Sequence, residues 1–461
     1  MENEALKDLF LTDVAVQDGG DLHGLLDEQL ITDVAELIDE FPEQENLIIS
    51  NLSLNRAVSV FKILDFPTQE RMIRSLPRSK VGDIINELPP DDRTALLSEL
   101  PGNIVKELLK LLRFDELKIT LALLGYPEDS VGRLMTPDYL DVEPDWTVRQ
   151  VLDHIREHGK DSETIDVIYV VDDKGKLLDD VRIREFLLVD PETMISELID
   201  GRFTAFNVND SQEEAINVFR KENRVALPVT DDHNTLLGIV TFDDVMWVAN
   251  EEYTEDIQKI GGTEALDEPY LEIALHKLVR KRGSVLVLLF IGEMFTATAM
   301  QHYQNTGIFL KFADLILFIP LILSCGGNSG SQASTLIVQA MALSEVTLAD
   351  WWRVMRRELL SGFFLGLILG IIGFIRITLW QILDVYNYGP HWILMAFTVF
   401  FALIGVIMWG SLMGSMLPII LKKFKVDPAT SSAPFVATVV DVTGIIIYCT
   451  VAIFILQHLL I

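Results

Sequence analysis

Five long apolar runs, separated by short polar segments, fill the chain after residue 283. Each run is long enough to cross the ~30 Å hydrocarbon core of a bilayer as a helix. The lengths of the runs and the charges between them favour five membrane-spanning helices over five buried helices of a soluble protein. The runs cover about residues 284–302, 308–325, 359–380, 392–421 and 435–460.

Clusters of basic residues set the predicted orientation of these helices. The clusters precede the first, third and fifth runs, whereas the loops after the first and third runs contain neither Lys nor Arg. Because cytoplasmic loops are enriched in basic residues, we expect the N-terminal part in the cytosol and the C-terminus outside the cell. The clusters are Lys277, Arg280, Lys281 and Arg282, then Arg353, Arg356 and Arg357, then Lys422, Lys423 and Lys425.

A short pattern with proline recurs between residues 66 and 112. A Phe-Pro pair at 66 is followed by Leu-Pro pairs at 76, 88 and 100, and each pair opens about ten residues of amphipathic, helix-forming sequence. Proline suits a helix start, and a regular step predicts short helices stacked into a superhelix. Asp91 and Asp92 follow two prolines in this pattern, where they either stabilise the helix N-terminus or bind a cation.

A longer repeat occupies residues 134–250. Segment 147–155 matches 211–219, and segment 166–187 matches 224–246. Each copy predicts a helix, an apolar strand, a turn containing two aspartates, a second strand and a new helix start.

This repeat resembles a tandem pair of CBS domains, a regulatory module that commonly binds adenine nucleotides. The resemblance implies a possible nucleotide site, for example for ATP, at Thr241 and Asp244, which match the T-x-x-D pattern of the family. In the first copy these positions are Arg182 and Glu185, so we expect at most one intact site.

The charge is concentrated in the first part of the chain. Residues 1–270 contain 59 acidic and 25 basic residues. Residues 271–461 contain 9 acidic and 12 basic residues. Nucleic-acid binding depends on Lys and Arg, so this excess argues against nucleic acid and favours cations as partners. The HIREH segment at 154–158 fits a zinc-peptidase pattern, but no other sequence supports catalysis there, and a solvated helix face is the default expectation.

Two acidic residues within the apolar runs are candidates for ion transport. Glu293 and Asp441 lack a local partner of opposite charge, and intramembrane carboxylates are costly unless they are functional. The segment PLILSCGGNSGSQ at 320–332 is also unusual, because polar or broken backbone at this depth must face protein or water. Its small residues either contact a hydrated ion or form a tight packing face between helices.

Taken in order, the Leu-Pro repeats, the CBS-like pair, the 320–336 segment and the segments VDPATSSAP and PFVATVVDVTG resemble the MgtE family of magnesium channels or transporters. The resemblance covers nearly the whole chain. It implies a multidomain fold: an all-α superhelical N-terminal domain, an α/β tandem CBS pair and an α-helical membrane domain with five transmembrane helices. The expected boundaries are 1–130 for the helical domain, 131–250 for the CBS pair, 251–283 for a connecting helix and linker, and 284–461 for the pore domain.

The resemblance also implies a homodimer with its pore on the two-fold axis and cytosolic domains that sense Mg²⁺. In the connecting segment 245–262, two pairs of acidic residues four positions apart should weaken the helix unless a cation screens them, although a solvated acidic face is the alternative. The expected pore ligands are Asp441, Asn328, Gly326 and Gly327. The expected regulatory ligands are Asp91, Asp92, Glu251, Glu252, Glu255, Asp256 and Asp427.

The favoured function is therefore a Mg²⁺ channel in the cell membrane, closed by intracellular Mg²⁺. One alternative is a carrier that exchanges a divalent cation for Na⁺ or H⁺, with Glu293 as the coupling carboxylate. A nucleotide-regulated membrane enzyme is a third hypothesis, but the sequence contains no supporting catalytic set.

Overall fold

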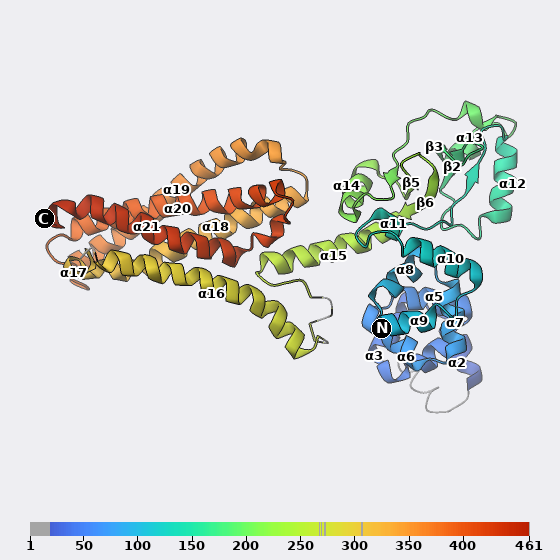
Figure 1. Cartoon of the computed structure of the whole chain (residues 1–461), viewed down its shortest axis with the longest axis horizontal. Coiled ribbons are helices and arrows are strands. Elements are labelled where there is room, and N and C mark those ends of the chain that lie inside the picture. Colours follow the sequence, from blue (N-terminus) through green and yellow to red (C-terminus); the bar gives the residue numbers. More distant parts are fainter. Residues whose placement is uncertain (1–18, 267, 269, 272, 306–307, 461) are drawn as a thin grey trace. The chain divides into compact units, whose positions relative to one another are not determined.

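A computed structural model describes residues 19–266, 268, 270–271, 273–305 and 308–460. The first 18 residues of the expected helical domain lie outside the described residues. The chain divides into two compact units, Met1–Ala249 and Asn250–Ile461. Figure 1 labels most of their elements, and each unit is described by itself.

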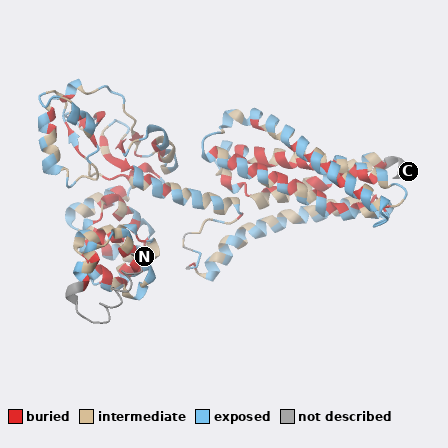
Figure 2. Ribbon diagram, turned by 180° about the vertical axis from the view of Figure 1, so that it is seen from behind, coloured by how far each residue is buried: buried red, intermediate tan, exposed pale blue. Residues whose placement is uncertain are grey.

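The first unit begins with short helices, as the spacing of the prolines predicts. Successive helices start every twelve residues: α5 (Leu54–Ile63), α6 (Phe66–Ser75), α7 (Arg78–Glu87), α8 (Pro90–Glu99) and α9 (Gly102–Leu108). They are flanked by α2 (Gly19–Glu28), α3 (Ile31–Glu40), η1 (Pro42–Gln44), α4 (Glu45–Ser50) and α10 (Phe114–Leu123). One continuous apolar core runs through α2 to α9, and Figure 2 shows it as buried residues.

Leu-Pro pairs separate these helices for a steric reason. Leu76, Leu88 and Leu100 each end a helix in an extended conformation and are buried. A proline disfavours the helical conformation of the residue before it, so each leucine leaves its helix and turns into the core. The prolines then occupy the N-cap position of the next helix, at Pro77, Pro89 and Pro101.

Two three-stranded sheets of the same topology confirm the longer repeat. In each sheet the first strand pairs in parallel with the second, and the second pairs antiparallel with the third. The strands are β1 (Asp141–Val142), β2 (Val167–Val171), β3 (Leu177–Arg182), β4 (Phe206–Asn207), β5 (Ala226–Thr230) and β6 (Leu236–Thr241). The helical elements are α11 (Val131–Leu134), α12 (Val148–His158), α13 (Ile183–Leu188), η2 (Ile195–Glu197) and α14 (Gln212–Glu222).

A single helix, α15 (Phe242–Ile260), follows the second sheet, and its residues from Asn250 onward belong to the second unit. It ends where the sequence predicts, at two glycines. Gly262 has a φ of +79°, which an L side chain rarely adopts.

Among its described residues, the second unit contains five helices that are long and apolar enough to cross a membrane. Three of the expected bounds were too short. The first helix begins at Leu275, the second span continues to Ala342 instead of ending near Cys325, and the third begins at Leu348. The elements are α16 (Leu275–Asn305), α17 (Ile308–Lys311), η3 (Ala313–Phe318), α18 (Ile319–Ala342), η4 (Leu348–Asp350), α19 (Trp351–Ile382), α20 (Trp392–Lys423), η5 (Pro428–Thr430) and α21 (Ala433–Leu460).

The small-residue segment of the second span remains α-helical and packs against another helix. A Cβ added to Gly410 of α20 would lie 2.4 Å from the carbonyl oxygen of Gly326, and one added to Gly414 would lie 2.0 Å from that of Gly330. Neither position can hold a side chain without separating the helices. Two small-xxx-small pairs therefore bring the α18 and α20 backbones into direct contact.

Candidate functional site

Carboxylates from three separate segments of the first unit gather near one lysine. They come from the first turn of α8, from the loop after α12 and from the first turn of α15. Lys62 Nζ, on α5, is 2.8 Å from Asp92 Oδ2. We call the following five residues the carboxylate cluster: Asp91, Asp92, Glu163, Asp243 and Asp244.

Asp91 is the most deeply buried member of the carboxylate cluster. It is 4 % exposed, and neither of its buried carboxylate oxygens has a hydrogen-bond partner. Burial, together with the neighbouring carboxylates of Asp244 and Asp92, raises its pKa well above the ordinary value. The sequence left open whether Asp91 and Asp92 stabilise a helix start. Both aspartates lie in the first turn of α8, where negative charge favours the helix N-terminus, and Asp91 also lies among other acidic groups.

Burial raises the pKa of three further members, Asp92, Glu163 and Asp244. The pKa of Asp244 is raised to about 6 by burial and by Asp243 and Asp92, although a hydrogen bond from Thr241 opposes the shift. The pKa values of Asp92 and Glu163 are also raised by burial, while Lys62 acts in the opposite direction on both. Ionising this region without a cation therefore costs free energy.

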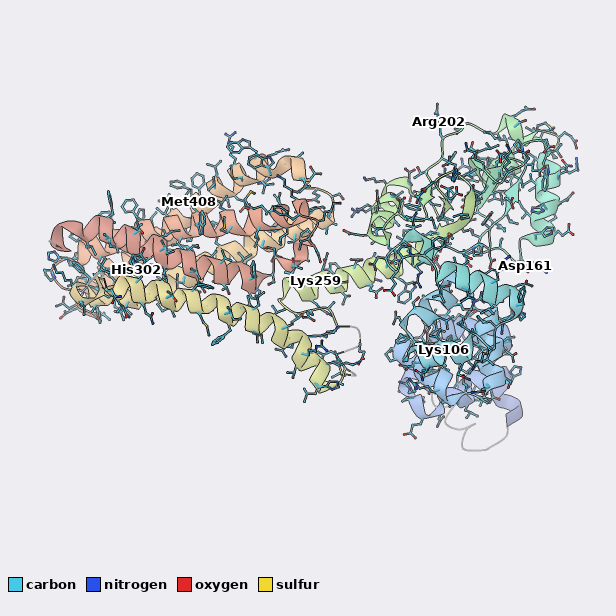
Figure 3. All side chains as sticks on the ribbon, in the orientation of Figure 1. Lys106, Asp161, Arg202, Lys259, His302 and Met408 are labelled. Carbon is cyan, nitrogen blue, oxygen red and sulfur yellow. The ribbon has the colours of Figure 1, made fainter. Side chains whose placement is uncertain are left out.

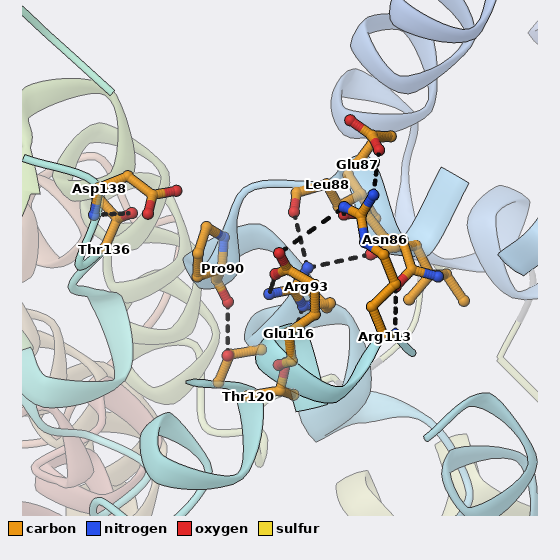
Figure 4. A network of polar contacts seen from close by, with 12 residues as sticks. Asn86, Glu87, Leu88, Pro90, Arg93, Arg113, Glu116, Thr120, Thr136 and Asp138 are labelled. Carbon is orange, nitrogen blue, oxygen red and sulfur yellow. Dashed lines mark hydrogen bonds and ion pairs between the residues drawn. The ribbon is translucent and has the colours of Figure 1, made fainter. Parts of the chain in front are cut away.

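A buried arginine next in sequence to the carboxylate cluster fixes the start of α8. Arg93 is fully buried, donates from Nε to Thr120 Oγ1 at 2.8 Å and from Nη1 to the carbonyl oxygen of Leu88 at 3.2 Å, and pairs with Glu116 (Figure 4). These contacts tie α8 to α10. The backbone that carries Asp91 is therefore rigid, so the cluster cannot relax easily by moving that carboxylate away.

The cluster does not form a complete cage for a metal. Within the described residues, no group of three or more His, Cys, Asp or Glu side chains is placed to hold an ion. Mg²⁺ commonly keeps several of its waters and uses only one or two carboxylates. The arrangement therefore suits a hydrated divalent cation better than a fully dehydrated one.

The two residues of the T-x-x-D pattern at the end of the second sheet are hydrogen-bonded to each other. Thr241 Oγ1 donates a hydrogen bond to Asp244 Oδ2, and the threonine is buried. Asp244 thus belongs both to the expected nucleotide pattern and to the carboxylate cluster. The corresponding residues of the first copy, Arg182 and Glu185, are exposed.

A second lysine lies where the sequence suggested a regulatory cation. Lys259, labelled in Figure 3, lies near the end of α15 and pairs with Glu255 and with Asp427, whose Oδ2 is 2.7 Å from its Nζ. Asp427 also accepts a hydrogen bond from the backbone of Ala429 at 2.8 Å. This ion pair ties the connecting helix to the segment that precedes α21.

The two intramembrane carboxyl groups face each other in the second unit. Asp441 of α21 is hydrogen-bonded to Glu293 of α16. Next to this pair, a Cβ on Gly292 would lie 2.6 Å from Thr438 Cγ2, so α16 and α21 are in close contact. Two carboxyl groups this close repel each other when both are ionised, unless they share a proton in a hydrogen bond or a cation lies between them.

The serines of α18 and the three expected pore residues of this helix have different surroundings. Ser329 bonds to Ser411 at 2.8 Å, and Ser331 and Ser334 donate to backbone oxygens of the chain before and at the start of α21. Asn328 is exposed on the surface of the unit. Gly326 packs against α20 and α21, and Gly327 faces Ala437 of α21. The serines thus form hydrogen bonds to neighbouring elements. A role for Asn328, Gly326 and Gly327 in a pore stays a prediction.

Comparison with known proteins covers almost every part of the chain. A family model described as a divalent cation transporter, MgtE, matches residues 319–451. A model of the MgtE intracellular N domain matches 30–129, and the CBS domain model matches 131–191 and 178–251. The magnesium transporter MgtE of Thermus thermophilus is 37 % identical over 331 residues, which are 72 % of this chain and 71 % of the relative. The chain belongs to the MgtE family.

Other relatives of this MgtE chain agree in length and fold. The magnesium transporter MgtE of Bacillus subtilis is 26 % identical over 433 residues, 94 % of this chain and 93 % of the relative. A crystal structure of the soluble part of a magnesium transporter is 26 % identical, with a TM-score of 0.51, and covers 54 % of this chain and 99 % of that one. The chain is thus a multi-pass membrane transporter with an intracellular N domain rather than an enzyme, which confirms the expected family and fold class.

Sequence reasoning missed four contributors to these sites: Lys62, Glu163, Asp243 and Lys259. Lys259 could have been found, because it lies four residues after Glu255 and oppositely charged residues at this spacing pair on a helix. Lys62 and Glu163 could not, because no local pattern connects them with Asp91. They approach it only through the packing of the helical domain and the CBS pair in the first unit.

Proposed function

We propose that this MgtE chain forms a homodimeric channel that admits Mg²⁺ to the cell and closes when intracellular Mg²⁺ is high. Asp441 carries the proposal for the pore. It lies in the apolar helix α21 and faces a second carboxyl group, that of Glu293. Two copies of Asp441 across a two-fold axis would offset the charge of a hydrated Mg²⁺ without binding it too tightly to leave.

The regulatory part of the proposal assigns cation sensing to the carboxylate cluster and to the connecting helix. Asp91 and Asp92 provide buried carboxylates whose ionised forms need a cation, and their neighbours come from the CBS pair. On α15, Glu251, Glu252, Glu255 and Asp256 would act with Asp427 near the start of α21. The ion pair of Lys259 with Glu255 and Asp427 supports a link between the connecting helix and the pore helix.

Removal of residues 1–126 tests where the Mg²⁺ signal is received. The truncated protein should conduct but respond poorly to internal Mg²⁺, since Asp91 and Asp92 are then absent. Currents from liposomes at several internal Mg²⁺ concentrations measure this response. Normal inhibition in the truncated protein would place the sensing sites elsewhere.

A second candidate function is a carrier that exchanges a divalent cation for a proton. The hydrogen bond between Asp441 and Glu293 favours it, because a proton shared by two carboxyl groups can be displaced by an entering cation. The same liposome currents separate the two candidates. Flux far above the turnover of a carrier, with no proton movement in the opposite direction, would exclude exchange.

ATP binding at the CBS pair is a further part of the proposal. Thr241 and Asp244 would hold the ribose, which requires that their mutual hydrogen bond open. Binding of ATP to the purified protein, lost in Thr241→Val and Asp244→Asn, would support this site.

A further inference from the structure

Lys62 lies at the one place in the first unit where a mobile cation is proposed to act. Its Nζ is 2.8 Å from Asp92 Oδ2, and the lysine and aspartate side chains are 25 % and 22 % exposed. Burial alone would lower the pKa of the Lys62 ammonium, but Asp92, Asp91 and Asp244 together raise it above its ordinary value. The ammonium is therefore a permanent positive charge at neutral pH.

The charges around this lysine are unbalanced. The carboxylate cluster has five members, and the positive charge of Lys62 acts on four of them. Asp91, which is almost fully buried, has no hydrogen-bond partner for either oxygen. One ammonium thus offsets part of the repulsion and leaves charge for a further cation.

Lys62 and Asp92 belong to the helical domain, whereas Asp243 and Asp244 follow the second sheet of the CBS pair. An ammonium at this position attracts carboxylates of both parts. It does so without any solute, in contrast to Mg²⁺, which must be supplied from the cytosol.

We propose that Lys62 is a tethered cation that holds the helical domain against the CBS pair when divalent metal is absent. When Mg²⁺ is present, the ammonium group still fills part of the site of the ion and neutralises part of the negative charge that the ion would otherwise neutralise. This inference rests on the proposed sensing role of the carboxylate cluster. It specifies the regulation of that site: the metal-free protein is partly closed, and Mg²⁺ acts against a weaker repulsion than five carboxylates alone would create.

Amide hydrogen exchange of residues 90–99 in the full-length protein in detergent tests the proposal, in EDTA and in saturating Mg²⁺. In EDTA, Lys62→Met should exchange at least about threefold faster than the wild type, which corresponds to a half-buried ion pair. Saturating Mg²⁺ should restore the wild-type rate. Lys62→Arg, which keeps the charge, should match the wild type in both conditions.

Lys110→Met is the matched control, because it removes an exposed lysine that pairs with Glu107 on the surface of the same domain. Equal exchange of Lys62→Met and the wild type in EDTA would overturn the role of Lys62. If Lys62→Met still exchanges faster in saturating Mg²⁺, while the wild type responds to Mg²⁺, the role of Lys62 is also overturned. Such a result would indicate that the lysine side chain contributes by packing alone and not by its charge. Asp91→Asn tests the metal site itself. A wild-type response of hydrogen exchange to Mg²⁺ in that variant would overturn the proposed sensor, but it would not affect the comparison of Lys62→Met with the wild type in EDTA.

Discussion

The two units hold their carboxylates in opposite ways. In the first unit, five carboxylates from separate segments approach one lysine, and burial raises the pKa of Asp91, Asp92, Glu163 and Asp244. In the second unit, one pair of carboxyl groups lies between two apolar helices. A sensor benefits from repulsion that a cation relieves, whereas a transport path must release its ion. Crowded carboxylates therefore suit the first task and a sparse pair suits the second.

Neutralising the pore carboxylate should have the largest effect. Asp441→Asn should reduce Mg²⁺ uptake by about a hundredfold or more while leaving the protein folded, because it removes the main negative charge available to the ion in the apolar part of the unit. Uptake by liposomes that contain the purified protein measures the loss. Glu345→Gln, which removes an exposed carboxylate outside the spans, is the control and should transport normally. Wild-type uptake in Asp441→Asn would contradict the pore assignment.

A methyl group between α18 and α20 should destabilise the second unit. Gly414→Ala places a Cβ 2.0 Å from the carbonyl oxygen of Gly330, so the helices must separate and lose packing, at a cost of about 2–4 kcal/mol. The midpoint of thermal unfolding in detergent, followed by gel filtration, measures this cost. Gly283→Ala in α16 meets no atom within 4 Å and should be neutral or slightly stabilising. If the two variants unfold at the same temperature, the direct backbone contact is wrong.

Removing a carboxylate from the first unit should change sensing and leave conduction intact. Asp91→Asn should raise the Mg²⁺ concentration needed for half-inhibition by about tenfold, because a proposed ligand and a buried charge are both lost. Liposome currents at graded internal Mg²⁺ give this value. Asp83→Asn, at an exposed position on α7, should leave it unchanged. If Asp91→Asn is half-inhibited at the same Mg²⁺ concentration as the wild type, the carboxylate cluster has no role in gating.

Acidification should mimic the cation at the carboxylate cluster, with the smallest effect. The pKa of Asp244 is about 6 in the folded protein against 3.8 ordinarily, so its contribution to stability is present below about pH 4 and is lost as the pH rises through 6. In EDTA, the first unit should therefore unfold about 2 °C higher at pH 5.5 than at pH 7.5. Calorimetry measures the difference, which Asp244→Asn should reduce. A higher unfolding temperature at pH 7.5 would contradict the raised pKa.

Local patterns predicted most of the fold. The twelve-residue step of the helices, the two matching sheets and the glycine end of α15 each follow from steric preferences that act over a few residues. The span bounds were less accurate, because α18 continues through a glycine- and serine-rich segment that local propensity alone would weaken. Packing against α20 stabilises that segment, and packing cannot be seen in one helix alone.

The sites were predictable only where chemistry is local. Asp441 is conspicuous in an apolar run, and Asp91 follows two prolines at a helix start. The approach of Lys62 and Glu163 to Asp91, and of Glu293 to Asp441, depends on contacts between residues far apart in the sequence. No spacing rule gives such contacts.

Glycine contacts also determine which helices of the second unit can move. Gly362 and Gly366 of α19 bring its backbone against Met408 and Ile404 of α20, in addition to the contact between α18 and α20. Helices joined at this distance cannot slide without steric overlap, so α18, α19 and α20 should behave as one rigid block. The helix α16 has no buried residue among those described. We therefore expect the mechanical compliance of the unit to reside in α16, away from Gly292, where this helix meets α21.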